Sequence, residues 1–450
     1  MSELTIIGGG LAGSEAAWQA AERGVDVTLY EMRPLISTGA HRTGMLAELI
    51  CSNSLGSLRP ERANGLLKEE LSRLGSLLVK TAEETALPAG SALAVDRDAF
   101  AARVTQTLEN HPRVRIIREE MHKIPDGLCV IAAGPLASPA LANALQDMAG
   151  SHSLFFFDAI APVIAADSID MTVAFRASRY NHGELDSGDY INCPLTREQY
   201  NAFQAALVSA ERIQLHDFEL EINQGVQANQ KVFFERCLPI EVLADREQRA
   251  LIFGPLRPIG IRDPRSGRGS YAVVQLRQDD RSASMYNLVG FQTNLTFAEQ
   301  KRVFRLIPGL ANAEFLRFGQ MHRNTYLCAP RIVKPTLQTR ERANLLFAGQ
   351  IIGVEGYLGN IASGLVAGWN AARLALGRHA LRFPPETMLG ALLGYISSAN
   401  PREFQPMKAN YGLFPDLENA FASRADRNQR LFKRSMAALE PYITDRFTGG

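Results

Sequence analysis

The chain has 450 residues, is 46% hydrophobic and 21% charged, and carries a formal net charge of +1 at pH 7. These values are typical of a globular protein of two or three domains. A balance so close to zero excludes an argument from overall charge for nucleic-acid binding, so any such surface has to be local.

The first residues form an apolar run at once, without the basic and apolar regions of a signal peptide, and no stretch approaches membrane-spanning length. The five cysteines are sparse, odd in number and include no C-x-x-C pair. This pattern argues against a disulfide framework and against a zinc site, and it suits a reducing compartment. We therefore predict a cytoplasmic protein with no metal and no membrane partner.

The clearest predicted unit spans the first 31 residues. Residues 4–7 are predicted as a buried strand, 11–23 as an alanine-rich helix that stops at Gly24, and 25–30 as a second strand. Gly8, Gly10 and Gly13 give the G-x-G-x-x-G spacing between the first strand and the helix, and Glu31 ends the second strand. This order of strand, glycine turn, helix, strand and acid is the context that a dinucleotide-binding fingerprint requires.

Each part of this fingerprint has a physical task. The first glycine makes a tight turn, the second lets backbone amides approach a pyrophosphate, and the third lets helix and strand pack closely. The helix N-terminus favours the negative charge of the phosphates, and Glu31 is expected to accept hydrogen bonds from the adenosine ribose. A tight turn without a ligand is the plainer alternative.

Two further predicted strands end in glycine turns, at residues 128–134 and 345–349. NAD and FAD share the fingerprint, but three glycine-ended strands so far apart in the chain favour FAD held by a discontinuous domain. The predicted cofactor-binding residues are Gly8, Gly9, Gly10, Leu11, Ala12, Gly13, Glu31, Arg33, Gly134, Gly349 and Gln350. Asn53 joins them only through the resemblance described below.

The pattern of apolar and polar residues changes from about residue 151. Short β-like runs at 155–165, 190–195 and 231–243 surround a helical stretch at 196–213, and the tail after residue 385 is predicted to be mostly helical. The fold class is therefore α/β: an FAD-binding, Rossmann-like domain is interrupted by an α+β insertion domain and followed by a helical tail. The predicted boundaries are 1–150 and 328–450 for the two parts of the FAD-binding domain, and 151–327 for the insertion.

Local basic excess lies in the insertion and directly after it. The glycine- and proline-rich segment 257–281 carries six arginines against three aspartates, and the segment 317–342 is similarly basic. Planar guanidinium groups on such a loop suit phosphate contacts, while a solvated loop with scattered ion pairs explains them equally well. Arg257, Arg262 and Arg265 are the candidate substrate contacts.

Two of the cysteines are candidates for a catalytic role. Cys51 lies in "AELICSNSLG" and Cys237 in "FFERCLPIE", where Arg236 precedes it. An adjacent arginine lowers a thiol pKa only if it turns toward the sulfur, and neighbours in a strand point to opposite faces. A buried structural cysteine is the common case, so these residues alone leave both readings open.

The chain resembles the bacterial folate- and FAD-dependent tRNA (uracil-5-)-methyltransferases, smaller relatives of the flavoprotein that modifies wobble uridine. Eight blocks carry the resemblance in family order: "GGGLAGSEAAWQAAERGV", "AELICSNSL", "YINCPLTREQYNAF", "FFERCLPIEVLADR", "YAVVQLRQDD", "YNLVGFQTNLTFAEQKRVFRLIPGL", "MHRNTY" and "FAGQIIGVEGY". The family pattern continues after "GVEGY" with Val-Glu-Ser, where this chain has Leu358, Gly359 and Asn360. It has "PMNANFG" where this chain has "PMKANYG", with Lys408 and Tyr411. We expect local differences near the cofactor at the first place and in contacts to tRNA or folate at the second.

The resemblance implies a glutathione-reductase-type FAD domain and a specific reaction. Methylenetetrahydrofolate donates a one-carbon unit, reduced FAD carries it, NADH or NADPH supplies electrons, and the product is 5-methyluridine at position 54 in the tRNA T-loop. Uracil C5 is a poor nucleophile until a thiolate adds at C6 and makes an enolate. The resemblance implies Cys237 for that addition and places Cys51 beside the flavin, as general base or shield. It makes His322 and Arg323 candidates for the folate. The alternatives are the same chemistry on ribosomal RNA, a non-catalytic tRNA-binding flavoprotein, and an FAD oxidoreductase of a small molecule.

Overall fold

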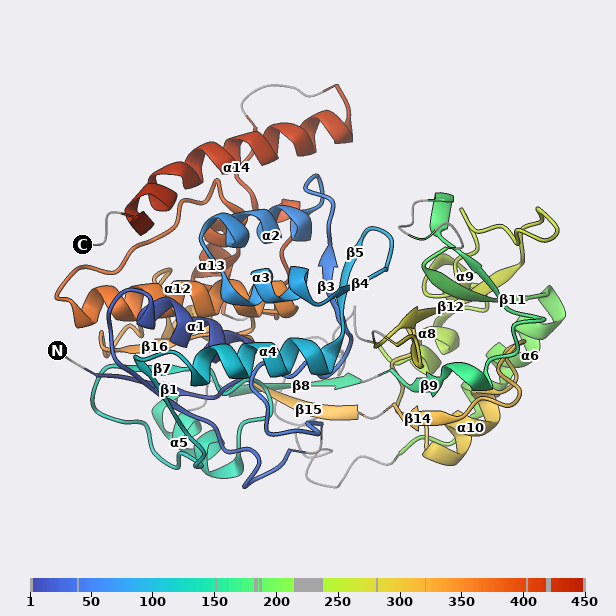
Figure 1. The fold of residues 1–450 in the computed structure, drawn as a ribbon, viewed down its shortest axis with the longest axis horizontal. Helices are drawn as coiled ribbons and strands as arrows, with labels where there is room; N and C mark the ends of the chain where they lie inside the picture. Colours follow the sequence, from blue (N-terminus) through green and yellow to red (C-terminus); the bar gives the residue numbers. More distant parts are fainter. Residues whose placement is uncertain are drawn as a thin grey trace.

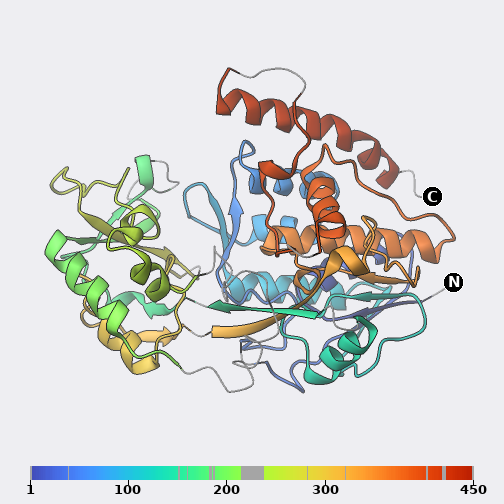
Figure 2. The same ribbon diagram turned by 180° about the vertical axis from the view of Figure 1, so that it is seen from behind.

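The computed structural model describes residues 3–447, except 39, 150–152, 160, 182–184, 186–187, 214–237, 281, 320, 402–403 and 418–421. Figure 1 shows a larger part, which contains both chain ends, and a smaller part. A ribbon of two antiparallel strands, β8 (Ser153–Ala159) and β15 (Met321–Leu327), runs between them in both views (Figures 1 and 2). The smaller part is therefore inserted between two stretches of the chain that build the larger one.

A five-stranded parallel sheet forms the centre of the larger part, in the order β16-β7-β1-β2-β6. The predicted strands at 4–7, 25–30, 128–134 and 345–349 are all confirmed, and they are neighbours in this sheet. The last of them comes from more than two hundred residues further along the chain, so the sheet is discontinuous as predicted. The strands are β1 (Leu4–Ile7), β2 (Val27–Tyr30), β6 (Val114–Ile117), β7 (Cys129–Ile131) and β16 (Leu345–Phe347).

Helices α1 (Leu11–Ala21) and α12 (Tyr357–Ala375) pack against each other at backbone contact. A Cβ atom on Gly364 would lie 2.3 Å from the carbonyl oxygen of Ala12, and one on Gly368 would lie 2.3 Å from that of Ala16. Only glycine allows so close an approach. Small residues at these positions therefore let α12 lie directly against α1.

The helical tail is confirmed, and a buried carboxylate fastens it to the rest of the larger part. Glu70 accepts hydrogen bonds from the backbone N–H groups of Met388 and Leu389 at 2.6 and 2.8 Å, and from the Ser435 hydroxyl at 2.5 Å. The helices and small strands here are α2 (Ala63–Arg73), α3 (Leu77–Glu84), α4 (Arg97–Glu109), α5 (Pro139–Ala149), α11 (Ala329–Ile332), α13 (Met388–Ser398), α14 (Arg424–Phe447), β3 (Ser54–Ser57), β4 (Ala86–Leu87) and β5 (Ala92–Val95).

The smaller part is a six-stranded sheet in the order β10-β11-β12-β13-β9-β14, with helices packed on it. It has its own hydrophobic core, in which Tyr200, Phe203, Phe291 and Phe304 are fully buried. Its elements are β9 (Val163–Ala165), β10 (Phe175–Ala177), β11 (Tyr190–Leu195), β12 (Ala272–Gln278), β13 (Met285–Leu288), β14 (Phe315–Arg317), α6 (Arg197–Ser209), α8 (Ile240–Arg246), α9 (Ala250–Phe253) and α10 (Phe297–Phe304).

One predicted strand of the insertion is wrong in its described portion. The run 231–243 was expected to be β-like, yet α8 starts at Ile240. Pro239 occupies the residue before the first turn with φ −53°, a value its ring enforces and a helix start accepts. Residues 231–237 lie outside the described residues.

The chain passes into the smaller part near β8 and out of it near β15. Both passages lie within a few residues of the boundaries expected at 150/151 and 327/328. The division into 1–150, 151–327 and 328–450 stays a prediction. In the part of the chain that the structure describes, no helix has both the length and the apolar character needed to span a membrane.

Candidate dinucleotide cleft and its thiol loop

Two glycines of the turn after β1 lie in contacts that leave no room for side chains. Gly8 has φ +101°, and a Cβ there would lie 2.6 Å from the carbonyl oxygen of Ala132. A Cβ on Gly13 would lie 1.8 Å from the carbonyl oxygen of Gly8. Gly10 differs, since a Cβ there would meet nothing within 4 Å. The open space over Gly10, at the N-terminus of α1, is where a fingerprint of this kind holds a diphosphate.

This open space belongs to a cleft with two connected chambers, which share Gly10, His41, Ala133 and Leu136. Counting their open mouths, the chambers contain about 820 and 510 Å³ of empty space, a size suited to large organic ligands. Most predicted cofactor residues line one or both chambers. The first is lined by Gly10, Leu11, Ala12, Cys51, Gly134, Gly349 and Gln350, and the second by Gly8, Gly10, Glu31 and Arg33.

At the second chamber Glu31 and Arg33 form a buried ion pair. Glu31 accepts hydrogen bonds from the Gly9 N–H at 2.8 Å and from the Arg33 Nε at 2.9 Å, and both charged residues are almost completely buried. Burial acts to raise the pKa of Glu31, but the hydrogen bonds and charge of Arg33, with the Gly9 N–H, hold that pKa below its ordinary value. An ionised carboxylate is therefore held at the chamber that would take an adenosine ribose.

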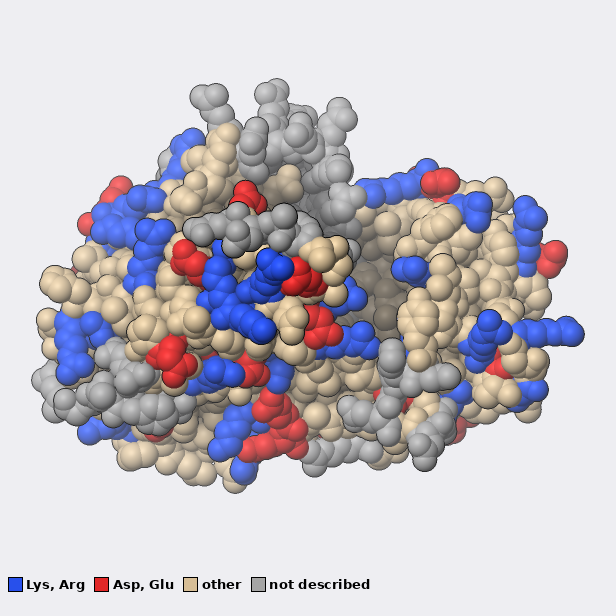
Figure 3. Space-filling view, turned by 90° about the horizontal axis from the view of Figure 1, so that it is seen from above, with Lys and Arg blue, Asp and Glu red and all other residues tan. Residues whose placement is uncertain are grey.

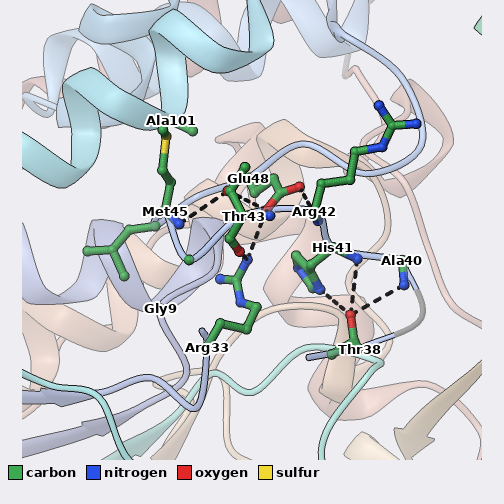
Figure 4. Close-up of polar contacts among 12 residues, drawn as sticks. Gly9, Arg33, Thr38, Ala40, His41, Arg42, Thr43, Met45, Glu48 and Ala101 are labelled. Carbon is green, nitrogen blue, oxygen red and sulfur yellow. Dashed lines mark hydrogen bonds and ion pairs between the residues drawn. The ribbon is translucent and has the colours of Figure 1, made fainter. Parts of the chain in front are cut away.

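A second carboxylate, Glu48, organises its neighbours in the loop 40–48 beside the first chamber (Figure 4). It accepts from the Arg42 N–H at 2.8 Å, from the Thr43 hydroxyl at 2.8 Å and from the Arg33 Nη1 at 3.2 Å. On the same loop, His41 Nδ1 lies 2.5 Å from the Thr38 hydroxyl, and His41 borders both chambers. Sequence reasoning assigned no role to His41 or Glu48.

The Cys51 loop, residues 51–53, is held from the larger part by the first residue of α12. The Tyr357 phenol oxygen accepts the backbone N–H groups of Cys51 at 2.9 Å and Ser52 at 3.0 Å. Burial raises the pKa of Tyr357, and a charge on the nearby Cys51 thiol acts in the same direction. The phenol therefore stays protonated and holds the loop at the wall of the first chamber, which both side chains line.

The smaller part holds the same loop from the other side. Arg277 Nη2 donates to the Ser52 hydroxyl at 2.9 Å, and Asn53 Nδ2 donates to the carbonyl oxygen of Gln278 at 2.8 Å. Asn53 is fully buried and is not among the residues that line the cleft. The structure thus gives Asn53 a positioning task, and its predicted contact with the cofactor stays a prediction.

The described cysteines divide into two kinds. Burial raises the pKa of the Cys129 and Cys193 thiols to about 12, so neither supplies a thiolate near neutral pH. Cys328 is also buried, whereas Cys51 is partly exposed at the cleft. Among the four cysteines that the structure describes, only Cys51 is placed for chemistry in the cleft.

For the remaining predicted site residues the structure shows either a place on the smaller part or no described side chain. Cys237 lies outside the described residues, and His322 and Arg323 are on β15 with side chains that the structure does not describe. Arg265 donates to Asp263 and to the carbonyl oxygens of Thr172 and Val173 at 2.6–2.9 Å, which makes it a loop-building residue. Arg262 and Arg257 belong to the same surface loop of the smaller part.

The first departure from the family pattern lies at the cleft wall. Asn360 borders the first chamber, and its Nδ2 donates to the carbonyl oxygen of Gly356 at 2.9 Å. Leu358 is buried, and a Cβ on Gly359 would lie 3.0 Å from Val354. Any consequence of this departure for the cofactor therefore acts through Asn360.

Comparison with known proteins agrees with this geometry. Residues 3–379 match the family model described as Glucose inhibited division protein A. A relative from Symbiobacterium thermophilum is 54% identical across 97% of this chain and 96% of its own length, and one from Brevibacillus brevis is 51% identical across 98% of each. Both are named methylenetetrahydrofolate–tRNA-(uracil-5-)-methyltransferase TrmFO. This chain belongs to the TrmFO family.

Membership of the TrmFO family confirms the resemblance that the eight sequence blocks carry. The fold is also shared with a solved structure, that of Aquifex aeolicus GidA in its form II crystal, with a TM-score of 0.68 and 17% identity. That alignment covers all of this chain and 75% of the GidA chain. The fold of this TrmFO family member is accordingly the interrupted FAD-type α/β fold predicted from the sequence.

Proposed function

We propose that this chain transfers a one-carbon unit from methylenetetrahydrofolate to C5 of the uridine at position 54 in the T-loop of tRNA. FAD is the proposed bound cofactor, and NADH or NADPH is the electron source. The observation that carries the proposal is the full-length identity of more than half with enzymes named for this reaction. The cytoplasm is the proposed location, because tRNA is the substrate.

The described residues fit FAD in three respects. Cβ atoms on Gly10 and Gly134 would project into open space, so the backbone there can approach a diphosphate and a ring system. An ionised Glu31 marks one end of the cleft, and Gly349, Gln350 and Cys51 border the other. Reduced FAD, when bound, supplies the carrier of the one-carbon unit and the hydride that completes the methyl group.

The division of labour between the two thiols is part of the proposal. Cys237 adds to uracil C6, so that the pyrimidine becomes an enolate nucleophilic at C5. Cys51, on its clamped loop, faces the chamber proposed for the flavin ring, where it takes the C5 proton or shields the reacting carbon. The uridine has to leave its stack in the T-loop to reach this position.

The proposal also assigns contacts to the two substrates. His322 and Arg323 are proposed to serve the folate, and Arg257, Arg262 and Arg265 to serve tRNA through the basic loop of the smaller part. Because Arg265 is fully engaged inside the loop, its proposed contribution is to shape the loop for its neighbours.

The reaction class is tested by incubating the purified protein with a tRNA transcript, NADH or NADPH, and methylenetetrahydrofolate labelled in its methylene carbon. We expect label in the T-loop and none when labelled S-adenosylmethionine replaces the folate. A ribosomal RNA fragment in a parallel reaction tests the alternative substrate. Label in that fragment and none in tRNA contradicts the proposal.

The thiol roles are tested with a T-loop substrate that carries 5-fluorouridine, since fluorine at C5 blocks proton removal and traps the covalent adduct. We expect Cys51→Ala to keep the adduct and Cys237→Ala to lose it. The opposite pattern reverses the two roles.

A further inference from the structure

Three chain segments bring a local excess of positive charge to one face of the larger part. They are residues 59–62, just before α2, residues 408–416, and residues 424–434, the first turns of α14. Together they carry eight Lys or Arg against three Asp or Glu, although the whole chain has a net charge of only +1. We call these three segments the basic track.

Hydrogen bonds join the three segments of the basic track into one surface. The Tyr411 hydroxyl donates to the carbonyl oxygen of Pro60 at 3.4 Å, and Asn428 Nδ2 donates to that of Glu61 at 3.1 Å. Arg434 donates to two backbone carbonyl oxygens of the middle segment at 2.7 and 3.0 Å. The charges of the three segments therefore act together, even though more than three hundred residues separate the first segment from the other two.

Helix α14 directs part of this charge to solvent. Leu431, Ser435 and Leu439 are buried, and their spacing of four residues places them on the side of α14 that packs against the larger part. Lys433 is exposed, and so is Arg62 in the segment before α2. These two cations therefore lie on the outer face of the basic track.

One end of the basic track lies beside the dinucleotide cleft. The backbone N–H of Met407 donates to the carbonyl oxygen of Gly353 at 2.9 Å, so the chain leading into the middle segment runs alongside the start of α12. A Cβ on Gly356 would lie 3.8 Å from two side-chain carbons of Lys408. Lys408 therefore contacts the residue that precedes Tyr357, which lines the first chamber.

The figures show how the basic track lies relative to the smaller part. In Figure 1 the first turns of α14 are at the end of this helix nearer the smaller part, and the C-terminus of the chain is at the other end. Figure 3 looks onto the face that carries α14 and shows Lys and Arg side chains gathered beside the hollow between the two parts. The basic track thus belongs to the larger part's side of this hollow.

We propose that the basic track binds the phosphates of the RNA stem that flanks the T-loop, and that Lys408 is a contact which this chain adds to the family pattern. The inference rests on the proposed function, because it presupposes that a T-loop uridine enters the cleft. RNA duplexes are recognised mostly by shape and by contacts to phosphates and ribose hydroxyls. Cations that pair with the phosphates also release counterions, which makes the binding depend on salt.

An RNA stem suits the basic track better than a small anion does. None of the described side chains of the track lines the described cleft, so the charge is spread over an open surface. The eleven residues of α14 in the track extend about 16 Å, a length over which one strand of a duplex presents roughly five phosphates. Because only the target uridine has to reach Cys51, the stem stays outside the cleft, on the surface where the track lies.

The test compares the holoenzyme variant Arg62→Gln, Lys433→Gln with wild type. Two RNAs are titrated by fluorescence anisotropy over a range of salt concentrations: a T-arm hairpin, and a single strand with the same loop sequence but no stem. We expect the variant to bind the hairpin roughly tenfold more weakly at low salt, and its slope of log affinity against log salt to be shallower by about two. The single strand should bind to both proteins equally.

The variant Lys408→Asn restores the residue of the family pattern and tests the contact at the cleft. We expect it to make the slope for the hairpin shallower by about one, with tetrahydrofolate affinity unchanged. Loss of tetrahydrofolate affinity with unchanged hairpin binding overturns the assignment of Lys408, in favour of a folate contact.

Two controls are matched in charge and in side chain. Arg115→Gln with Lys123→Gln removes the same two charges from exposed positions on β6 and just after it, at the edge of the five-stranded sheet, and should leave hairpin binding unchanged. Arg62→Lys with Lys433→Arg keeps both charges of the track and should bind the hairpin as wild type does. Unchanged hairpin binding by Arg62→Gln, Lys433→Gln, an equal loss in the Arg115 control, or an equal loss for both RNAs overturns the inference.

The proposed function fails in a different way from this inference. A wild-type holoenzyme that binds neither RNA at any salt concentration contradicts RNA as the substrate. If wild type binds and methylates the hairpin, and the double variant of the track binds it equally well, only the basic track is lost.

Discussion

The two charged regions beside the cleft solve opposite problems. At the second chamber, Glu31 and Arg33 satisfy each other, and Glu48 and the Gly9 N–H complete the set. At the thiol loop, Arg97, Arg277 and Arg317 share a single aspartate and retain buried donors without acceptors. The first arrangement fixes the shape of a wall. The second keeps more positive than negative charge among the described residues, so removing a charge should have opposite effects on the stability of the free protein in the two regions.

The largest effect is expected for Glu31→Gln. The change leaves Arg33 buried with Glu48 as its remaining carboxylate, so we expect a loss of about 3 kcal/mol in the free energy of unfolding, the low end for breaking a buried pair. The measurement is chemical denaturation of the flavin-free protein. A variant that is as stable as wild type would remove the contrast between the two regions.

The same variant has a pH signature. The folded-state pKa of Glu31 is below its ordinary value of 4.5, so the ionised pair contributes stability above about pH 4.5 and loses it as the pH falls through the folded-state value. The stability difference between wild type and Glu31→Gln should therefore be full at neutral pH and shrink on acidification below pH 4.5. A difference that grows on acidification would contradict the assignment.

The second effect separates cofactor binding from folding within the glycine turn. Gly13→Ala places a methyl group against the backbone of Gly8, so we expect a cost of about 3 kcal/mol together with loss of retained flavin. Gly10→Ala places its methyl group in open space, so the melting temperature should stay near wild type while flavin is lost. The yellow absorbance of the purified protein and its thermal unfolding report the two properties. Flavin retained by Gly10→Ala would contradict the position proposed for the diphosphate.

A smaller effect is expected for Tyr357→Phe, which removes the acceptor of two backbone N–H groups from the Cys51 loop. We expect a cost of about 2 kcal/mol and faster amide hydrogen exchange at residues 51 and 52. Methyl transfer should fall while flavin remains bound. Unchanged exchange at those two amides would show that the phenol does not hold the loop.

The smallest effect is expected for Ser52→Ala, which removes the hydroxyl that accepts from Arg277. We expect a loss of about 1 kcal/mol, because the guanidinium then has one acceptor fewer among the described residues. Chemical denaturation of the flavin-free protein measures this loss. Equal stability of the variant and wild type would show that the hydrogen bond from Arg277 to Ser52 makes no measurable contribution.

Sequence reasoning worked where the signal is local. The turn at Gly8–Gly13, the acid at Glu31 and the strands that end before Gly134 and Gly349 follow from spacing within a few residues, and the fold brings nearly all of the predicted cofactor residues to one cleft. The prediction of a β-like run over 238–243 was wrong. It gave the β-branched residues of this run more weight than the helix-start signal of Pro239.

The three arginines at the thiol loop illustrate what local patterns cannot show. Arg97 and Arg277 are separated by 180 residues and look like ordinary charged positions until the fold brings Asp279, the residue after β12, to Arg97 at the start of α4. Arg317 was part of a basic excess that sequence alone could not distinguish from a solvated surface. Tyr357 and Glu48 both lie within blocks quoted for the resemblance. Their contacts could still not be predicted, because an acceptor is identified only by the donor that the fold brings to it.

The discontinuous sheet also determines the order in which parts of the chain can fold during synthesis. The fingerprint is complete by residue 31, but the cleft needs Gly349 and Gln350, and α1 needs the glycines of α12 against which it packs. At about 5–20 residues per second, the ribosome takes roughly 20–70 s to make the intervening chain. During that interval the apolar faces of β1 and α1 lack α12. The sheet strands of the smaller part all lie between residues 163 and 317, so this part can fold first. Flavin loading is therefore a late event in the life of the nascent chain.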